Sequence, residues 1–148
     1  MQNRFVAVAG AVAVAVGVVG CSSSSPSEPK QPPGSLPPGT AQVQIDGKDA
    51  GRTIHVKCGQ VVWSMFIDIG DKKSGAQVAF NTDRSFTATS VQITDMAGFT
   101  GSFQEGIQGD AKVSTLGSTY KITGTAAGFT QDAPDKNVTK PFQILANC

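Results

Sequence analysis

The feature that most constrains this fold is an alternation of apolar and polar residues that recurs from residue 41 to residue 148. A period of two places successive side chains on opposite faces of a β-strand, so that one face of each strand is buried. Gly, Asp, Asn and Ser interrupt the alternation every ~8–12 residues, and no stretch of this region has the spacing of an amphipathic helix. The pattern predicts an all-β domain, either a compact antiparallel sandwich or a partly open barrel.

About nine short strands are expected from this pattern. The longest apolar run, residues 61–69, predicts a single central strand with both faces partly covered. On one face it would place Val61, Trp63, Met65, Ile67 and Ile69. Turn signals separate other pairs of strands, namely Asp46-Gly47, Asn81-Thr82-Asp83 and Leu116-Gly117-Ser118.

Residues 1–20 have the pattern of a cleaved signal peptide and take no part in the expected domain. Met1–Arg4 is short, polar and positively charged, and Phe5–Val19 is an uninterrupted apolar run. At about 15 residues the run is shorter than the ~20 that a helix needs to cross the hydrocarbon core, which argues against a permanent transmembrane helix.

The apolar run ends in a lipobox-like sequence formed by Val18, Val19, Gly20 and Cys21. In such a sequence the cysteine thiol receives diacylglycerol before the signal is cut. Each buried acyl CH2 contributes about 0.8 kcal/mol, so two or three chains, such as palmitate, hold a protein stably on a membrane. Cys21 is therefore the predicted lipid attachment site. The mature protein is expected on the extracytoplasmic face of the cell membrane, or displayed at the cell surface.

The residues after Cys21 predict a tether rather than a folded segment. Six of the eight prolines lie in residues 22–40, together with many serines and only one large aliphatic residue, Leu36. Proline-rich chain favours extended, semi-rigid spacers. The expected organisation is a leader at 1–20, a lipidated tether at 21–40 and a β domain at 41–148.

Once Cys21 is assigned to the lipid, two cysteines remain. An oxidising, extracytoplasmic compartment favours a disulfide between Cys58 and Cys148. Closing a loop of about 90 residues contributes on the order of 4–5 kcal/mol in the chain-entropy treatment. Alternation places Cys58 on the same face as Val56, and Cys148 on the same face as Phe142, so both thiols would point inward. The disulfide could then join two neighbouring strands. The alternative is two free, buried thiols.

Charge and residue types argue against several functional classes. Loss of Arg4 with the leader leaves a formal net charge of zero, and no run of Lys or Arg suggests a nucleic-acid partner.

The single histidine, His55, is out of phase with the apolar face of its strand and is expected to face solvent. One histidine with two paired cysteines cannot supply a zinc site, and no cofactor is expected. Asp68, inside an apolar run, would need Lys57 or Lys72 as a partner if it were buried.

A set of motifs resembles the mycobacterial 19-kilodalton lipoprotein antigen family. The motifs are Val43–Asp49, Cys58, Tyr120–Gly128, and Lys140–Ile144 continuing to Cys148. The resemblance implies a non-enzymatic cell-envelope lipoprotein, a surface antigen that a host pattern-recognition receptor detects through the acylated N-terminus. Trp63 falls where the resemblance leads us to expect a smaller or polar residue, which favours a paralogue of the antigen.

The aromatic residues are the remaining material for a binding site. A domain this small spends most of its aromatic side chains on burial. An alternative function is therefore a carrier for a lipid or other apolar envelope ligand, with a cavity between the β layers near Trp63 and Phe99. The chain is expected to be a monomer.

Overall fold

The computed structural model describes residues 31–148, and every regular element in that range is a β-strand. The leader, the lipobox, Cys21 and the first part of the tether lie outside the described residues. Ten strands follow one another along the chain, one more than expected. They are β1 (Thr40–Ile45), β2 (Lys48–Thr53), β3 (Val56–Val61), β4 (Ser64–Gly70), β5 (Gly75–Asn81), β6 (Thr87–Met96), β7 (Phe99–Gln104), β8 (Asp110–Leu116), β9 (Thr119–Thr130) and β10 (Ala133–Asn147).

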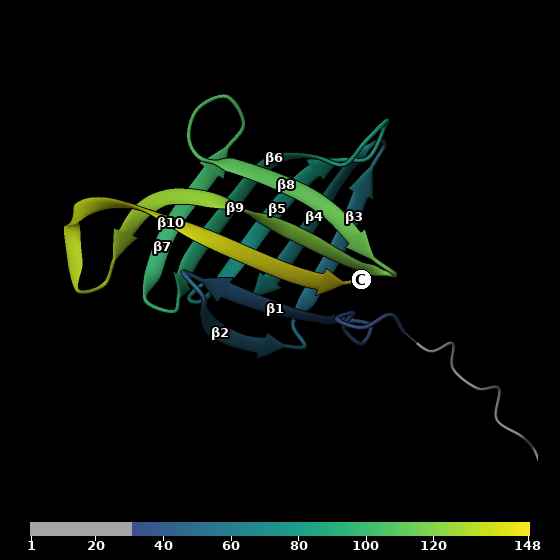
Figure 1. The fold of residues 1–148 in the computed structure, drawn as a ribbon, viewed down its shortest axis with the longest axis horizontal. Helices are drawn as coiled ribbons and strands as arrows, with labels where there is room; N and C mark the ends of the chain where they lie inside the picture. Colours follow the sequence, from purple (N-terminus) through teal and green to yellow (C-terminus); the bar gives the residue numbers. More distant parts are fainter. Residues whose placement is uncertain (1–30) are drawn as a thin grey trace, which may run out of the picture. The chain divides into compact units, whose positions relative to one another are not determined.

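The strands form two antiparallel layers, which confirms the predicted fold class. Hydrogen bonding runs in the order β2-β1-β10-β9-β7-β6-β5-β4-β3, and β8 adds to β9. Figure 1 shows β3 to β7 as one layer, with β1, β2, β8, β9 and β10 crossing it as the second. Strands β2 and β3 are neighbours in sequence but lie at opposite ends of this order, so the sheet is folded round as a partly open barrel.

Strand β9 joins the two layers. One of its edges pairs with β10, while the other pairs first with β8 and then, from Ala127 to Thr130, with β7. Glycines permit this change of partner, because a Cβ on Gly124 would overlap the carbonyl oxygen of Asp110 and a Cβ on Gly128 would overlap that of Thr100. The backbones therefore approach more closely than any side chain at these positions would permit.

The core lies between the layers and follows the predicted alternation. Phe80 and Phe99 are the largest fully buried side chains, and each comes from the layer formed by β3 to β7. The opposing layer contributes residues such as Ile122 from β9 and Ile144 from β10. Alternate residues of paired strands thus meet in one contiguous apolar cluster, which is the main source of stability in a domain of this kind.

The additional strand, which the sequence pattern did not predict, is the polar segment β2. It carries no apolar alternation. It pairs with β1 through a two-residue turn in which Asp46 and Gly47 both adopt positive φ, 53° and 74°. Both values suit a tight hairpin whose twist matches its strands, and the Asp-Gly signal is confirmed. Backbone hydrogen bonds to β1 hold β2 as a strand, with little side-chain burial beyond Ala50 and Thr53.

Three expectations about local structure were wrong. Residues 61–69 are not one strand, because the chain reverses at Val62-Trp63 and Val61 lies opposite Ser64. Ile54 is not on a buried strand face but is exposed between β2 and β3. The tether does not extend to residue 40, since Leu36 is buried and its amide donates to Thr119 Oγ1 at 2.9 Å.

Candidate functional site

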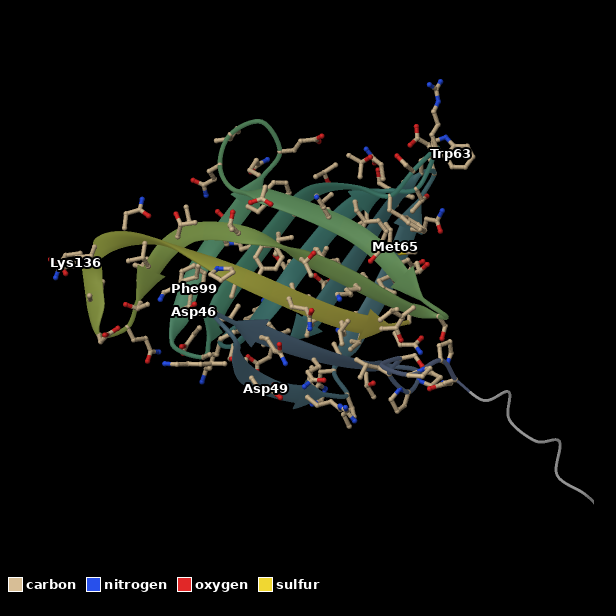
Figure 2. The ribbon with its side chains drawn as sticks, viewed as in Figure 1. Asp46, Asp49, Trp63, Met65, Phe99 and Lys136 are labelled. Atoms are coloured by element: carbon tan, nitrogen blue, oxygen red, sulfur yellow. A yellow bond between two sulfur atoms is a disulfide. The ribbon has the colours of Figure 1, made fainter. Side chains whose placement is uncertain are left out.

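The most distinctive surface feature is the turn between β3 and β4, here called the Trp63 tip and comprising residues 61–64. Val62 is 75% exposed and Trp63 60% exposed, and Val61 beside them is also exposed. Figure 2 shows Trp63 at the extreme end of this hairpin, pointing away from the sandwich. Large apolar side chains in succession on an exposed turn are unusual, whereas single exposed ones are common.

Hydrogen bonds hold the tip in a defined conformation. The amide of Thr82 and its hydroxyl donate to the carbonyl oxygen of Trp63 at 2.8 and 3.1 Å. The side-chain amide of Gln60 donates to the carbonyl oxygen of Val62 at 3.0 Å. Val62 has a φ of 54°, a region that costs a β-branched residue roughly 1–3 kcal/mol. The neighbouring loop therefore supports an apolar turn that local preference disfavours.

An aromatic cluster lies next to the loop that supports the tip. Phe86 contacts both Phe80 and Tyr120 edge-on, with ring centroids 6.0 Å apart in each case. Phe80 and Tyr120 are themselves 5.1 Å apart. Phe86 is partly exposed while Phe80 is fully buried, so the cluster closes this end of the core.

A groove of about 850 Å³ runs over the outer face of the layer formed by β3 to β6. Its lining mixes polar residues, including His55, Lys57, Asp68 and Gln77, with apolar residues such as Ile54 and Val56. Asp68 lies opposite Lys57 in the β3–β4 pairing, and both are exposed rather than buried. His55 is exposed, as predicted, although it precedes β3 and does not lie in a strand. The groove is an open surface on the outside of this layer and not the space between the layers.

One rim of the groove is closed by a tight connection between β4 and β5. The backbone amides of Ser74 and Lys73 donate to Asp71 Oδ1 at 2.9 and 2.7 Å. These hydrogen bonds hold the pKa of the Asp71 carboxyl below its usual value. Asp71 is accordingly a turn-forming carboxylate whose ionised state is favoured by the local backbone.

The structure does not bring together the two residues expected to line a carrier cavity. Trp63 is on the exposed tip, whereas Phe99 is 1% exposed and is packed in the core at the start of β7. Figure 2 shows them at well-separated places in the domain. Turn formation at Val62-Trp63, which removes Trp63 from the inward face of β4, is the physical reason.

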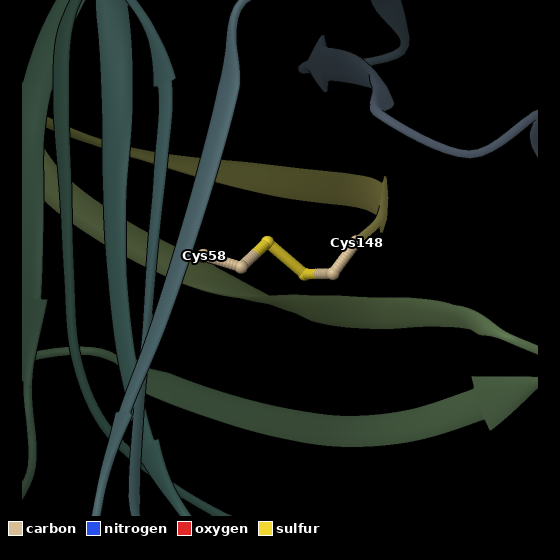
Figure 3. The surroundings of a disulfide bond; sticks show 2 residues. All are labelled: Cys58 and Cys148. Carbon is tan, nitrogen blue, oxygen red and sulfur yellow. A yellow bond between two sulfur atoms is a disulfide. The ribbon is translucent and has the colours of Figure 1, made fainter.

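The expected disulfide is present. Cys58 in β3 is bonded to Cys148 with Cα atoms 6.0 Å apart, and Figure 3 shows the bridge running from β3 to the end of the chain. Cys148 directly follows β10, and β3 and β10 are not neighbours in the sheet, contrary to the arrangement considered from sequence. The bridge instead fastens the edge strand of one layer to the other layer. The alternative of two free thiols was wrong.

Two features are absent from residues 31–148. No group of three or more His, Cys, Asp or Glu side chains there is arranged to hold a metal ion. That range also contains no helix of the length and apolarity needed to cross a membrane.

Comparison with known proteins places the chain in a family. Residues 34–148 match the family described as Mycobacterium 19 kDa lipoprotein antigen. A putative lipoprotein of Mycobacterium indicus pranii is 38% identical, with the whole of both chains covered. Lipoprotein LpqH of Mycobacterium tuberculosis is 35% identical over 97% of this chain and 96% of its own. The chain belongs to the mycobacterial 19 kDa lipoprotein antigen family, whose members are membrane-associated lipoproteins of the cell envelope.

Proposed function

We propose that this protein is a monomeric, non-enzymatic lipoprotein anchored by acyl chains on Cys21 to the extracytoplasmic face of the cell membrane. The observation that carries the proposal is the position of Cys21, directly after an apolar run and Val18-Val19-Gly20, in a chain whose relatives are lipoproteins. Acyl chains on this cysteine would supply the stable anchor, since one chain alone binds a membrane only marginally.

The acylated N-terminus is also the part that host innate receptors would recognise. Apolar acyl chains suit a buried receptor pocket, whereas the groove of the β domain is open and mixes polar with apolar residues. Residues 22–30, with their serines and prolines, would separate the acylated cysteine from the domain. The domain would then act as the antigenic, surface-displayed portion of the protein.

The described residues favour a non-enzymatic role. His55 is exposed, and none of the hydrogen bonds found in residues 31–148 links its side chain to a serine or threonine. Both described cysteines are held in the disulfide and so carry no free thiolate. Nucleophilic catalysis needs an activated nucleophile paired with a base, which these side chains do not form.

The intact mass of the membrane-extracted protein tests the anchor. We expect the wild-type protein to start at Cys21 and carry two or three acyl chains, and Cys21→Ala to lack them. Reduction should add one hydrogen atom, a proton with an electron, to each sulfur of the disulfide without releasing a fragment. An unmodified wild-type chain that begins elsewhere would refute acylation at Cys21.

Reporter cells that carry a receptor for acylated lipoproteins test recognition separately. The purified wild-type protein should activate them, and Cys21→Ala should not. Equal activation by both proteins would show that the β domain, and not the acylated terminus, is recognised.

A further inference from the structure

The chain enters the folded domain at one defined end of the sandwich. Pro32 lies against Gly117 in the β8–β9 turn. Just after it, the amide of Leu36 donates to Thr119 Oγ1, and Asn147 Nδ2 donates to the carbonyl oxygen of Leu36 at 2.7 Å. These buried hydrogen bonds fix residues 32–36 to the end where β9 begins and β10 finishes.

The Trp63 tip lies at that same end. Tyr120, the second residue of β9, contacts Phe86, which belongs to the connection between β5 and β6. That connection also supplies Thr82, whose amide and hydroxyl bond to Trp63. In Figure 1 the β3–β4 turn, the β8–β9 turn and residues 31–36 are all at the right of the domain.

The length of the preceding chain limits how far this end can be from the anchor. Ten residues of chain connect Cys21 to Gln31, and fully extended chain spans at most about 3.6 Å per residue, or about 36 Å in all. The opposite end of the sandwich is farther away by the length of β9, whose twelve residues extend at about 3.3 Å each. An acyl anchor therefore keeps the end with the Trp63 tip within reach of the lipid surface.

The chemistry of the tip suits a bilayer interface. Tryptophan is enriched at the level of lipid headgroups, because its ring is apolar while its indole N–H remains hydrogen-bonded. The adjacent Val61 and Val62 provide aliphatic surface, and the strained φ of Val62 holds this surface outward. In the supporting loop Arg84 and Asp83 are both exposed and offset one another, so no net charge there opposes a bilayer.

We propose that the Trp63 tip inserts into the interfacial region of the bilayer that carries the acyl anchor, and so fixes the orientation of the β domain on the membrane. This inference rests on the proposed acylation of Cys21. It adds a second, protein-borne membrane contact, with a lipid bilayer as the occupant of the exposed apolar tip. The groove on the outer face of β3 to β6 would be held in a fixed orientation relative to the membrane.

Trp63 provides its own probe, because it is the only tryptophan in the chain. The acylated protein is reconstituted into phosphatidylcholine–phosphatidylglycerol vesicles, and vesicles with brominated acyl chains are compared with unbrominated ones. We expect a blue shift of the Trp63 emission on reconstitution and a loss of intensity with brominated lipid. Flotation measures in parallel whether the protein is on the vesicles, which tests the anchor itself.

The outcomes distinguish the two proposals. A protein that fails to float with the vesicles refutes the acyl anchor. A protein that floats but whose Trp63 emission is the same with brominated and unbrominated lipid refutes insertion of the tip while leaving the anchor intact. A blue shift of the unacylated Cys21→Ala chain that grows with protein concentration in the absence of lipid would also overturn the proposal, in favour of contact between two copies.

A matched variant moves the probe to the other end of the sandwich. Phe129 is partly exposed near the end of β9, so Trp63→Phe combined with Phe129→Trp keeps a single tryptophan at a tolerant position. Its emission should show no loss with brominated lipid. Equal loss at both positions would mean that the domain lies on the membrane without a preferred end, and would refute the proposed orientation.

Discussion

Removal of the disulfide should greatly destabilise this domain. Cys58 and Cys148 are 90 residues apart, so the bridge restricts most of the unfolded chain. The chain-entropy relation for a loop of this length gives about 15 cal/mol/K, or about 4.6 kcal/mol near room temperature. Marginally stable domains have free energies of unfolding of only about 5–15 kcal/mol, so the loss would be a large part of the total.

The perturbation is best made with the double variant Cys58→Ser/Cys148→Ser, which leaves no free thiol in residues 31–148. Urea unfolding followed by far-UV circular dichroism measures the change, since the exposed Trp63 is a weak reporter of core unfolding. With a dependence of roughly 1.5 kcal/mol per molar urea, the midpoint should fall by about 3 M. Reduction of the wild-type protein should reproduce the fall.

Hydrogen exchange locates the effect. Strand β3 is an edge strand that pairs only with β4, and most of its side chains are exposed. Its amides should therefore lose protection first when the bridge is absent, before those of β9 and β10. A decrease of less than about 1 kcal/mol in the free energy of unfolding would refute the argument, because a constraint on a 90-residue loop should contribute several times more.

Three further changes test the core, the β9 junction and a surface ion pair. Phe80→Ala should lower the free energy of unfolding by about 3–5 kcal/mol in urea titration, because it empties a fully buried site. Gly128→Ala should lower the thermal midpoint, since its Cβ would overlap the carbonyl oxygen of Thr100. Lys140→Ala should raise the pKa of Asp46, as measured by NMR titration, because Lys140 donates to it at 2.7 Å and holds that pKa below 3.8.

The first two changes have a matched control variant, and the third has a pH dependence of its own. Phe129→Ala removes a partly exposed ring and should cost less than Phe80→Ala. Gly59→Ala should be tolerated, since nothing lies within 4 Å of its added Cβ, and equal losses at both glycines would contradict the steric argument. Because the pKa of Asp46 is lowered in the folded state, the ionised carboxylate stabilises the fold at pH values above the ordinary pKa of an aspartate. This stabilisation is lost as the pH falls through the lowered pKa. The part of this pH dependence that comes from Lys140 should disappear in Lys140→Ala, so the variant should lose a small amount of stability at neutral pH and none below the lowered pKa.

Period-two alternation was sufficient to predict the fold class and most strands. The alternation of residues 76–80 predicts that Val78 and Phe80 share the inward face of a strand. Both are buried, because β5 pairs with β4 on one edge and with β6 on the other. The turn at Val62-Trp63 was missed, since it contains no glycine, asparagine or proline, and distant Thr82 stabilises it. Strand β2 was missed for a related reason, because its backbone pairing with β1 needs no apolar pattern.

For the candidate site, too, the sequence predicted which residues matter but not where the fold places them. Trp63 was singled out from its residue type, but the sequence placed it on an inward face with Met65, whereas the turn places it on the exposed tip. The pairing of Cys58 with Cys148 could be predicted by elimination, because two cysteines remain once Cys21 is assigned to lipid. Their positions on non-adjacent strands of opposing layers could not.

The sequence by itself determined the all-β class, the leader pattern and the cysteine pairing, because each depends on local spacing or on residue count. Only the tertiary structure decided that Leu36 belongs to the core, that β9 joins both layers, and that the Trp63 tip shares an end with the start of the folded chain. These properties arise from contacts between residues far apart along the chain. Such contacts depend on strand order, which alternation within a single strand does not specify.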